Sequence, residues 1–175
     1  MIVVDSNVLA ARTLLCERSS RAIRIESLDN VWLVPRLWRY EFLNILATQI
    51  KTGRITPPKA HLLFDELRHL LSDNEHDPGA DAVLALVARN RITAYDAHFV
   101  ALAQTYRCEL VTEDAELLSK FPGLASSMDS FIARHSPTDG VRETPAPYLT
   151  RKRSSPRPTR TAPPQPLNPS TLIRP

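Results

Sequence analysis

The amino-acid sequence predicts an α/β protein, with a central parallel sheet between two layers of helices and a disordered tail rich in proline and arginine. Short runs of β-branched and apolar residues, typical of strands buried on both faces, alternate with longer amphipathic segments. Of the 15 prolines, five lie between residues 1 and 135 and ten between 136 and 175. The chain of 175 residues is therefore expected to consist of a folded domain, 1–135, and a tail, 136–175.

Three short apolar runs predict the strands. They cover residues 2–4, 31–34 and 110–112, and each ends near a proline or near residues that favour the start of a helix. Whether residues 73–77 form one more weak strand is left open, because the sequence does not distinguish between a strand and a loop there.

The helices are predicted from apolar side chains that recur every three or four residues. The expected helices are 8–16, 20–28, 36–51, 57–71, 77–88, 95–106 and 114–120. Trp32 and Trp38 are expected to lie in the core. Together, strands and helices in this order predict a three-layer α/β/α fold.

Charge divides the chain in the same way as proline does. The segment 136–175 carries seven Lys or Arg residues against two acids, so its net charge is +5, and the total of +3 leaves −2 for residues 1–135. A segment of this composition, with almost no aromatic residues, cannot bury enough apolar surface to order itself. Its cations could attract phosphates, or the tail could be a dispensable extension. We expect its deletion to leave the fold and the metal site intact.

Several protein classes are excluded by composition. Cys16 and Cys108 are too few for a disulfide framework, and each is expected to be a buried reduced thiol. No run approaches the roughly 20 apolar residues of a membrane span, and the acid at Asp5 interrupts any signal-peptide pattern. A soluble protein in a reducing compartment, the cytoplasm, is therefore expected.

Two acidic residues follow predicted strands. Asp5 comes directly after the strand 2–4, and Asp114 comes two residues after the strand 110–112. Parallel sheets hold their working residues at the carboxyl ends of strands, where strand order reverses. The alternative for each is an ordinary helix N-cap.

Two further acids lie on predicted helices. Glu41 sits beside the apolar stripe of the helix 36–51, where an unpaired buried charge would be costly, so an ion pair with Arg36 or Arg39 is the alternative. Asp96 lies in the first turn of the helix 95–106, where capping is again the alternative.

A gathering of acids has a chemical explanation. Carboxylates at one spot repel one another and raise one another's pKa unless a cation lies between them. Mg²⁺ prefers hard oxygen ligands, and it can activate a water molecule for attack on a phosphodiester. No Walker loop, no GxGxxG motif and no zinc-like spacing of the five histidines offers a rival site.

Four segments resemble one known family. Residues 2–9, 40–46, 95–103 and 110–118 are similar, in this order, to the four acidic segments of PIN domains, especially the VapC-type toxins of bacterial toxin–antitoxin pairs. The Tyr-Asp-Ala helix followed by a hydrophobic strand and Thr-x-Asp carries most of this resemblance. The resemblance covers roughly residues 1–133. The sequences of relatives usually end near the point where the tail of this chain begins.

The resemblance implies a PIN-like fold and a Mg²⁺-dependent endoribonuclease, with Mn²⁺ as a substitute. The implied metal ligands and catalytic residues are Asp5, Glu41, Asp96 and Asp114. Thr112, and Asn7 with it, would support them by hydrogen bonding, while Glu116 is expected to be a solvated helix residue. The family also implies RNA cleavage that leaves a 3′-hydroxyl and a 5′-phosphate, a homodimer, and inhibition by a cognate antitoxin whose C-terminal segment docks across helices near the site.

Two other functions remain open at this stage. One is a PIN-like regulator that binds RNA or antitoxin without turnover. The other is a haloacid-dehalogenase-like phosphohydrolase with Asp5 as nucleophile, but Asn7 stands where that class needs a second Asp, and no lysine lies between Lys59 and Lys120. Arg36 and Arg39 are expected to be surface charges rather than contacts to RNA phosphate.

Overall fold

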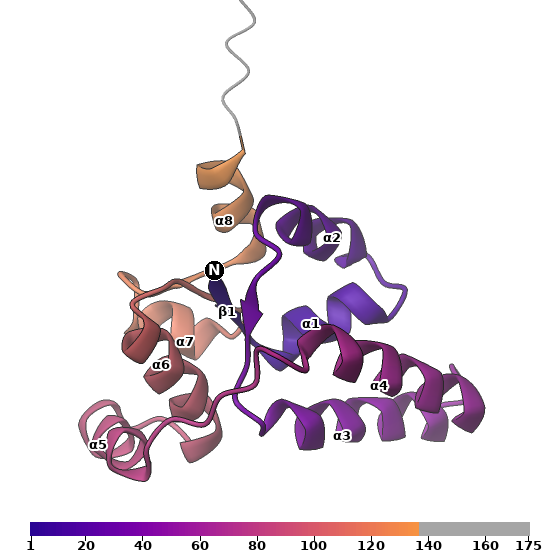
Figure 1. Cartoon of the computed structure of the whole chain (residues 1–175), viewed down its shortest axis with the longest axis horizontal. Helices are drawn as coiled ribbons and strands as arrows, with labels where there is room; N and C mark the ends of the chain where they lie inside the picture. Colours follow the sequence, from indigo (N-terminus) through magenta and orange to yellow (C-terminus); the bar gives the residue numbers. More distant parts are fainter. Residues whose placement is uncertain (137–175) are drawn as a thin grey trace, which may run out of the picture. The chain divides into compact units, whose positions relative to one another are not determined.

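The computed structural model describes residues 1–136, in which helices cover both faces of a four-stranded parallel sheet (Figure 1). The chain divides into two units, Met1–Thr138 and Asp139–Pro175. The predicted tail lies outside the described residues, apart from Ser136. The α/β/α class predicted from the sequence is confirmed.

The strand order is β2-β1-β3-β4. The strands are β1 (Ile2–Val4), β2 (Trp32–Leu33), β3 (Leu110–Val111) and β4 (Ala125–Ser126). β1 pairs with β2 on one side and with β3 on the other, so the chain reverses its direction of travel across the sheet at the boundary of β1 and β3. In open parallel sheets, such a boundary is where ligands bind.

The segment that the sequence left open, 73–77, forms an isolated parallel bridge rather than a strand. Val34 pairs with Glu75, the Val34 N–H donates to the Asn74 carbonyl at 3.0 Å, and the His76 N–H donates to the Val34 carbonyl at 2.9 Å. This bridge extends the edge of the sheet beside β2.

Eight helices lie within the described residues. They are α1 (Ser6–Thr13), α2 (Ser19–Leu28), α3 (Trp38–Lys51), α4 (Pro57–Leu71), α5 (Ala80–Asn90), α6 (Ala94–Tyr106), α7 (Ala115–Lys120) and α8 (Met128–His135). Seven of them match predicted helices, with ends that shift by a few residues. The segment Ala125–His135, which forms β4 and α8, was not predicted.

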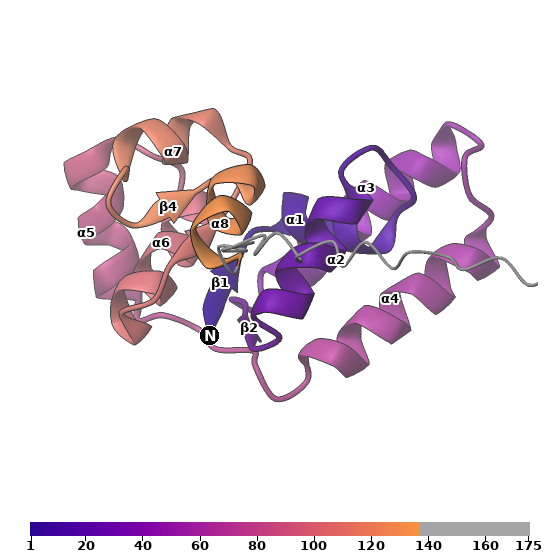
Figure 2. The same cartoon turned by 90° about the horizontal axis from the view of Figure 1, so that it is seen from above.

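The sheet separates two apolar cores. Because side chains alternate along a strand, Ile2 and Val4 of β1 enter one core and Val3 enters the other. The first core is closed by α1, α2, α3, α4 and α8, and the second by α5, α6 and α7. Figures 1 and 2 show α3 and α4 on one side of β1 and α5 and α6 on the other. Trp32 and Trp38 lie in the first core, as expected.

The predicted C-terminal end of the first helix, residue 16, was wrong, and the prediction for Cys16 was wrong as a result. α1 ends at Thr13, because Leu14 adopts an extended conformation at the C-cap, so Cys16 lies in a loop and is exposed. The expectation of a buried thiol therefore fails for Cys16. Cys108 is partly buried, and burial raises the pKa of its thiol. Both cysteines are free.

Within residues 1–136, none of the helices is both long and apolar enough to cross a lipid bilayer.

Candidate functional site

The carboxyl ends of β1 and β3 lie side by side and bring two of the predicted acids together. Asp5 follows β1, and its N–H donates to the Val111 carbonyl of β3 at 3.0 Å. Asp114 lies three residues after Val111, at the N-cap of α7. Both carboxylates therefore stand where the strand order reverses, as the sequence predicted.

Asp5 is not a side-chain helix cap. It occupies the N-cap position of α1, but its carboxylate makes no capping hydrogen bond. Instead, Asp5 Oδ2 accepts a hydrogen bond from the Thr112 hydroxyl at 2.5 Å and another from Asn7 Nδ2 at 2.6 Å. The capping alternative is therefore wrong for Asp5, and its carboxylate is oriented by two neutral donors.

Thr112 and Asn7 connect the ends of the two strands. Asn7 Nδ2 also donates to Thr112 Oγ1 at 3.2 Å, and Thr112 Oγ1 accepts the Asp114 N–H at 3.0 Å. Thr112 is completely buried. Asp114 Oδ1 accepts the Leu117 N–H at 2.9 Å, so the capping alternative is correct for Asp114, with one of its two oxygens.

Glu41 reaches this group from the first turn of α3. Its Oε2 accepts a hydrogen bond from the buried hydroxyl of Ser6, the residue that follows Asp5. The predicted alternative, an ion pair with Arg36 or Arg39, is wrong: Arg39 pairs with Glu75, and Arg36 lies beside Asp77.

Asp96 lies in the first turn of α6, where Thr93 is the N-cap. The Thr93 hydroxyl accepts the Asp96 N–H at 3.1 Å and donates to Asp96 Oδ2 at 2.6 Å. Thr93 therefore takes the capping role that had been the alternative for Asp96. His98, on the next turn, is close enough for its charge to lower the pKa of Glu41.

The electrostatics couple all four acids. Burial raises the pKa of Asp5; the hydrogen bonds from Thr112 and the Ser6 backbone oppose this rise, and the charges of Asp96 and Asp114 add to it. Burial also raises the pKa of Glu41; the Ser6 hydroxyl and His98 oppose the rise, and the charges of Asp5 and Asp96 add to it. The charges of neighbouring acids thus add to the effect of burial at both Asp5 and Glu41.

The four carboxylates share one more feature. Each has one oxygen fixed by the protein, namely Asp5 Oδ2, Glu41 Oε2, Asp96 Oδ2 and Asp114 Oδ1. In the part of the chain that the structure describes, no side-chain donor reaches the other oxygen of any of them. Oriented carboxylates with one available oxygen each are the hard donors that Mg²⁺ binds.

The four acids do not by themselves form a complete coordination shell for a metal ion. Between residues 1 and 136, no three side chains of Asp, Glu, His or Cys lie close enough together to surround an ion by themselves. Mg²⁺ is normally bound by one or two carboxylates and several waters. The donor set therefore fits an ion that keeps much of its hydration.

Sequence reasoning missed three polar residues of the site: Ser6, Thr93 and His98. Ser6 could have been found from its place between Asp5 and Asn7, and Thr93 from the capping-box spacing Thr-x-x-Asp. No sequence signal distinguishes His98 from a surface histidine, because its effect on the pKa of Glu41 depends on the tertiary structure.

The comparison with protein families decides the classification. A family model described as "PIN domain" matches residues 2–124, which include all four acids. The chain belongs to the PIN-domain family. The resemblance found in the sequence is thereby confirmed.

Named relatives agree with this membership. Ribonuclease VapC3 of Pyrobaculum aerophilum is 30% identical over 128 residues, which are 71% of this chain and 98% of that protein. Exonuclease VapC9 of the same organism is 32% identical over 97 residues, which are 54% of this chain and 70% of that protein. The crystal structure of PAE2754 from P. aerophilum superposes with a TM-score of 0.61 at 26% identity, over 76% of this chain and 94% of that chain.

Proposed function

We propose that this PIN-domain protein is a Mg²⁺-dependent endoribonuclease of the VapC type, the toxin of a type II toxin–antitoxin pair, acting in the cytoplasm. The observation that carries the proposal is the group of four carboxylates, each fixed through one oxygen and none paired with a cation among the described residues. The names of the two relatives, a ribonuclease and an exonuclease, support a nuclease.

The metal would be held by Asp5, Glu41, Asp96 and Asp114, directly or through water, with Mn²⁺ able to replace Mg²⁺. When bound, it would supply an activated water and neutralise charge on the scissile phosphate. Thr112 and Asn7 would orient Asp5 toward the ion, because both donate to the same oxygen. Ser6 would do the same for Glu41.

A hollow of about 490 Å³ beside the site offers a path for RNA. Asn7 lines it, and so do the exposed residues Arg18 and Arg54. Neither arginine has a carboxylate partner within 4.0 Å in the described part of the chain, whereas Arg36 and Arg39 are both paired. We therefore expect Arg18 and Arg54, rather than Arg36 and Arg39, to contact phosphates that flank the cleaved bond.

We further propose a homodimer and a cognate antitoxin as protein partners. A hollow of about 300 Å³ between α3 and α4 is lined by apolar side chains that include Leu46, Ile50 and Phe64, with Leu43 exposed at its rim. Such a surface suits the apolar face of a protein segment. The PIN domain itself is proposed to comprise 1–135, with 136–175 as a dispensable basic extension.

Two other functions serve as outcomes of the test. A regulator without turnover would bind RNA and leave it intact. A phosphohydrolase on this site would need a lysine near Asp5, but the Lys120 amino group is bound to Glu116 and to the carbonyls of Asn90 and Arg91. Hydrolysis of a chromogenic phosphate monoester would reveal that activity.

The test is cleavage of a mixed, labelled RNA pool by protein freed of any antitoxin. It compares Mg²⁺ with EDTA, and wild type with Asp5→Asn and Asp96→Asn variants that melt as folded proteins. Glu116→Gln is the matched control, because this acid lies on α7 but pairs with Lys120. Cleavage that needs Mg²⁺, survives in the control and disappears in both variants supports the proposal. Intact RNA under every condition contradicts it.

A further inference from the structure

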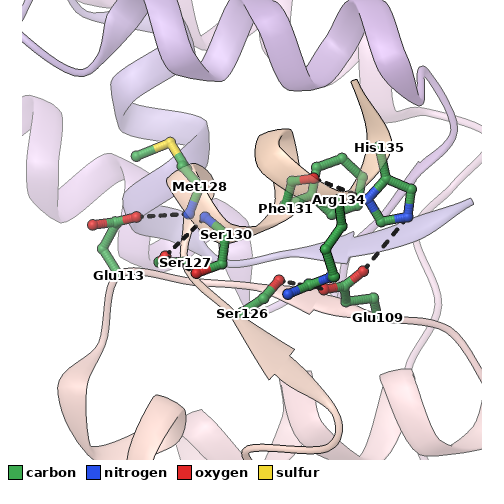
Figure 3. A network of polar contacts seen from close by, with 9 residues as sticks. All are labelled: Glu109, Glu113, Ser126, Ser127, Met128, Ser130, Phe131, Arg134 and His135. Carbon is green, nitrogen blue, oxygen red and sulfur yellow. Dashed lines mark hydrogen bonds and ion pairs between the residues drawn. The ribbon is translucent and has the colours of Figure 1, made fainter. Parts of the chain in front are cut away.

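Helix α8 follows the segment that matches the PIN-domain model, yet it is attached to the strand that leads into the site. Figure 3 shows the polar contacts between α8 and two glutamates that flank β3. Glu109 precedes the strand, and Glu113 follows it between Thr112 and Asp114. The two glutamates hold opposite ends of the same helix.

Glu113 holds the start of α8. Its Oε1 accepts the N–H of Met128, the first residue of the helix, at 2.9 Å. This N–H is one of the donors that a helix leaves unsatisfied at its start, and a carboxylate there is favoured by the helix dipole. Ser127 satisfies a second donor, since its hydroxyl accepts the Ser130 N–H at 3.2 Å.

Glu113 also touches the site through its backbone. Its N–H donates to Asn7 Oδ1 at 3.2 Å. Because one end of the Asn7 amide accepts this bond, the other end, Nδ2, is turned toward Asp5 and Thr112. An amide without this contact could rotate and present its oxygen to the Asp5 carboxylate, which would repel it.

Glu109 holds the end of α8 without touching the site. Its carboxylate accepts hydrogen bonds from Arg134 and from Ser126 of β4, and His135 Nε2 lies 4.0 Å from its Oε2 (Figure 3). Its backbone carbonyl accepts the Val3 N–H at the amino-terminal side of the sheet. Glu109 therefore offers a built-in control for the docking of α8.

We infer that Glu113 is a positioning residue for the metal site: by binding the first N–H of α8 it fixes its own peptide, the Asn7 amide and, through that amide, Asp5. The inference rests on the proposed function and deepens it. Glu113 does not itself need to touch metal or RNA. Its carboxylate is committed to Met128, and its influence passes through the hydrogen bond between its N–H and Asn7.

The test compares Glu113→Ala with Glu109→Ala in the full chain. Both changes weaken the attachment of α8, and both are expected to lower the melting temperature. We expect only Glu113→Ala to weaken Mg²⁺ binding, measured by titration calorimetry, by about 10-fold to 100-fold, the usual effect of losing a group that orients a metal ligand. Mg²⁺-dependent cleavage should fall with it and recover in part at high Mg²⁺.

Two further variants separate positioning from folding. Glu113→Gln keeps an oxygen that can accept the Met128 N–H, so it should restore most of the Mg²⁺ affinity. Glu113→Asp keeps the charge but is one carbon shorter, so it should resemble Glu113→Ala. Wild-type affinity in both the Asp and the Ala variants, or an equal loss of affinity in Glu109→Ala, would overturn the inference.

The proposed function can be judged separately in the same experiment. If the wild type neither binds Mg²⁺ nor cleaves RNA, the nuclease proposal fails and this inference fails with it. If the wild type does both and Glu113→Ala does so equally well, only the role of Glu113 is contradicted.

Discussion

The pKa values of two acids in this domain, Glu75 and Asp5, are shifted in opposite directions. The Glu75 side chain is 6% exposed, and it accepts hydrogen bonds from Arg39 Nε and Trp38 Nε1, both at 2.7 Å. Burial opposes the ionisation of Glu75, but these bonds and the charges of Arg39 and Arg36 outweigh it, so its pKa is lowered. Burial raises the pKa of Asp5, and its hydrogen-bond donors, the side chains of Thr112 and Asn7 and the Ser6 backbone, are all neutral, so the pKa stays raised.

The difference shows which acids lack a cationic partner among the described residues. Arg36, just before α3, and Arg39, within it, lie close to Glu41 in sequence, yet they pair with Asp77 and Glu75. The fold thus neutralises the acids at the edge of the sheet with its own arginines and leaves those at the carboxyl ends of β1 and β3 without one. A partly buried group of acids without cationic partners fits an exogenous divalent ion.

The largest expected effect comes from Asp5→Asn. Asparagine keeps an oxygen for Thr112 and Asn7 but removes the charge, so RNA cleavage should fall by about 1000-fold or more, because metal activation contributes several kcal/mol at about 1.36 kcal/mol per tenfold. Single-turnover cleavage rates measure this. A variant that retains a tenth of the wild-type rate would contradict the role of Asp5.

Glu75→Ala should have the opposite pattern of effects: it should lower the stability of the fold without affecting the metal site. Its loss leaves the buried indole N–H of Trp38 and the guanidinium of Arg39 without their acceptor, which should destabilise the domain by about 1–3 kcal/mol. Denaturant unfolding measures this cost. Mg²⁺ affinity should be unchanged, and a large fall in affinity would mean that the two groups of acids are not independent.

Stability of the metal-free protein should depend on pH through Asp5 and Glu41. Both pKa values are raised in the folded state, so the folded protein holds these protons more tightly than the unfolded chain does. Their contribution is therefore full below the ordinary values of 3.8 and 4.5 and is lost as pH rises through the raised values. Each group can change stability by at most about 1.4 kcal/mol per pH unit.

Urea unfolding at a series of pH values checks this, with Asp5→Asn as the control that should flatten the decline. A metal-free protein that becomes more stable over the same rise in pH, with the same slope in the variant, would contradict the pKa shifts as its cause.

The smallest expected effect is that of Thr93→Ala. The hydroxyl caps α6 and also holds Asp96, so its removal should cost about 1 kcal/mol of stability and loosen one metal ligand. Thermal melting and Mg²⁺ titration measure the two consequences. Thr93→Ser keeps the hydroxyl and should restore both the stability and the Mg²⁺ affinity. If the Ser variant is as unstable and binds Mg²⁺ as weakly as the Ala variant, the effect comes from the lost methyl group.

Much of this site could be predicted because it follows from strand ends. The apolar run before Asp5 and the run before Asp114 fixed both positions, since the carboxyl ends of neighbouring parallel strands share one edge. The capping alternatives for Asp5 and Asp114 could not be separated by sequence, because both residues precede a helix. Only the side-chain rotamer distinguishes them, and it depends on Thr112 and Asn7 across the strand boundary.

The errors and omissions have physical reasons too. β4 has two residues, Ala125 and Ser126, with no β-branched pattern, and its pairing with β3 is a tertiary contact. α8 has only eight residues, and its two buried side chains, Met128 and Phe131, are too few to show a helical period in the sequence. The contact of Glu41 with Ser6 rather than with Arg39 depends on the rotation of α3, which local periodicity does not determine.

The most direct test of the central claim is the effect of Mg²⁺ on thermal stability. Wild type, Asp5→Asn and Glu75→Gln would be melted at neutral pH with and without Mg²⁺. At a hundredfold excess over its Kd, an ion bound only by the folded state contributes about 2.7 kcal/mol, which corresponds to a rise of roughly 5–10 °C in Tm. We expect this rise in wild type and in Glu75→Gln, and none in Asp5→Asn. An equal rise in all three proteins, or no rise in wild type, would contradict a metal site built on the unneutralised acids.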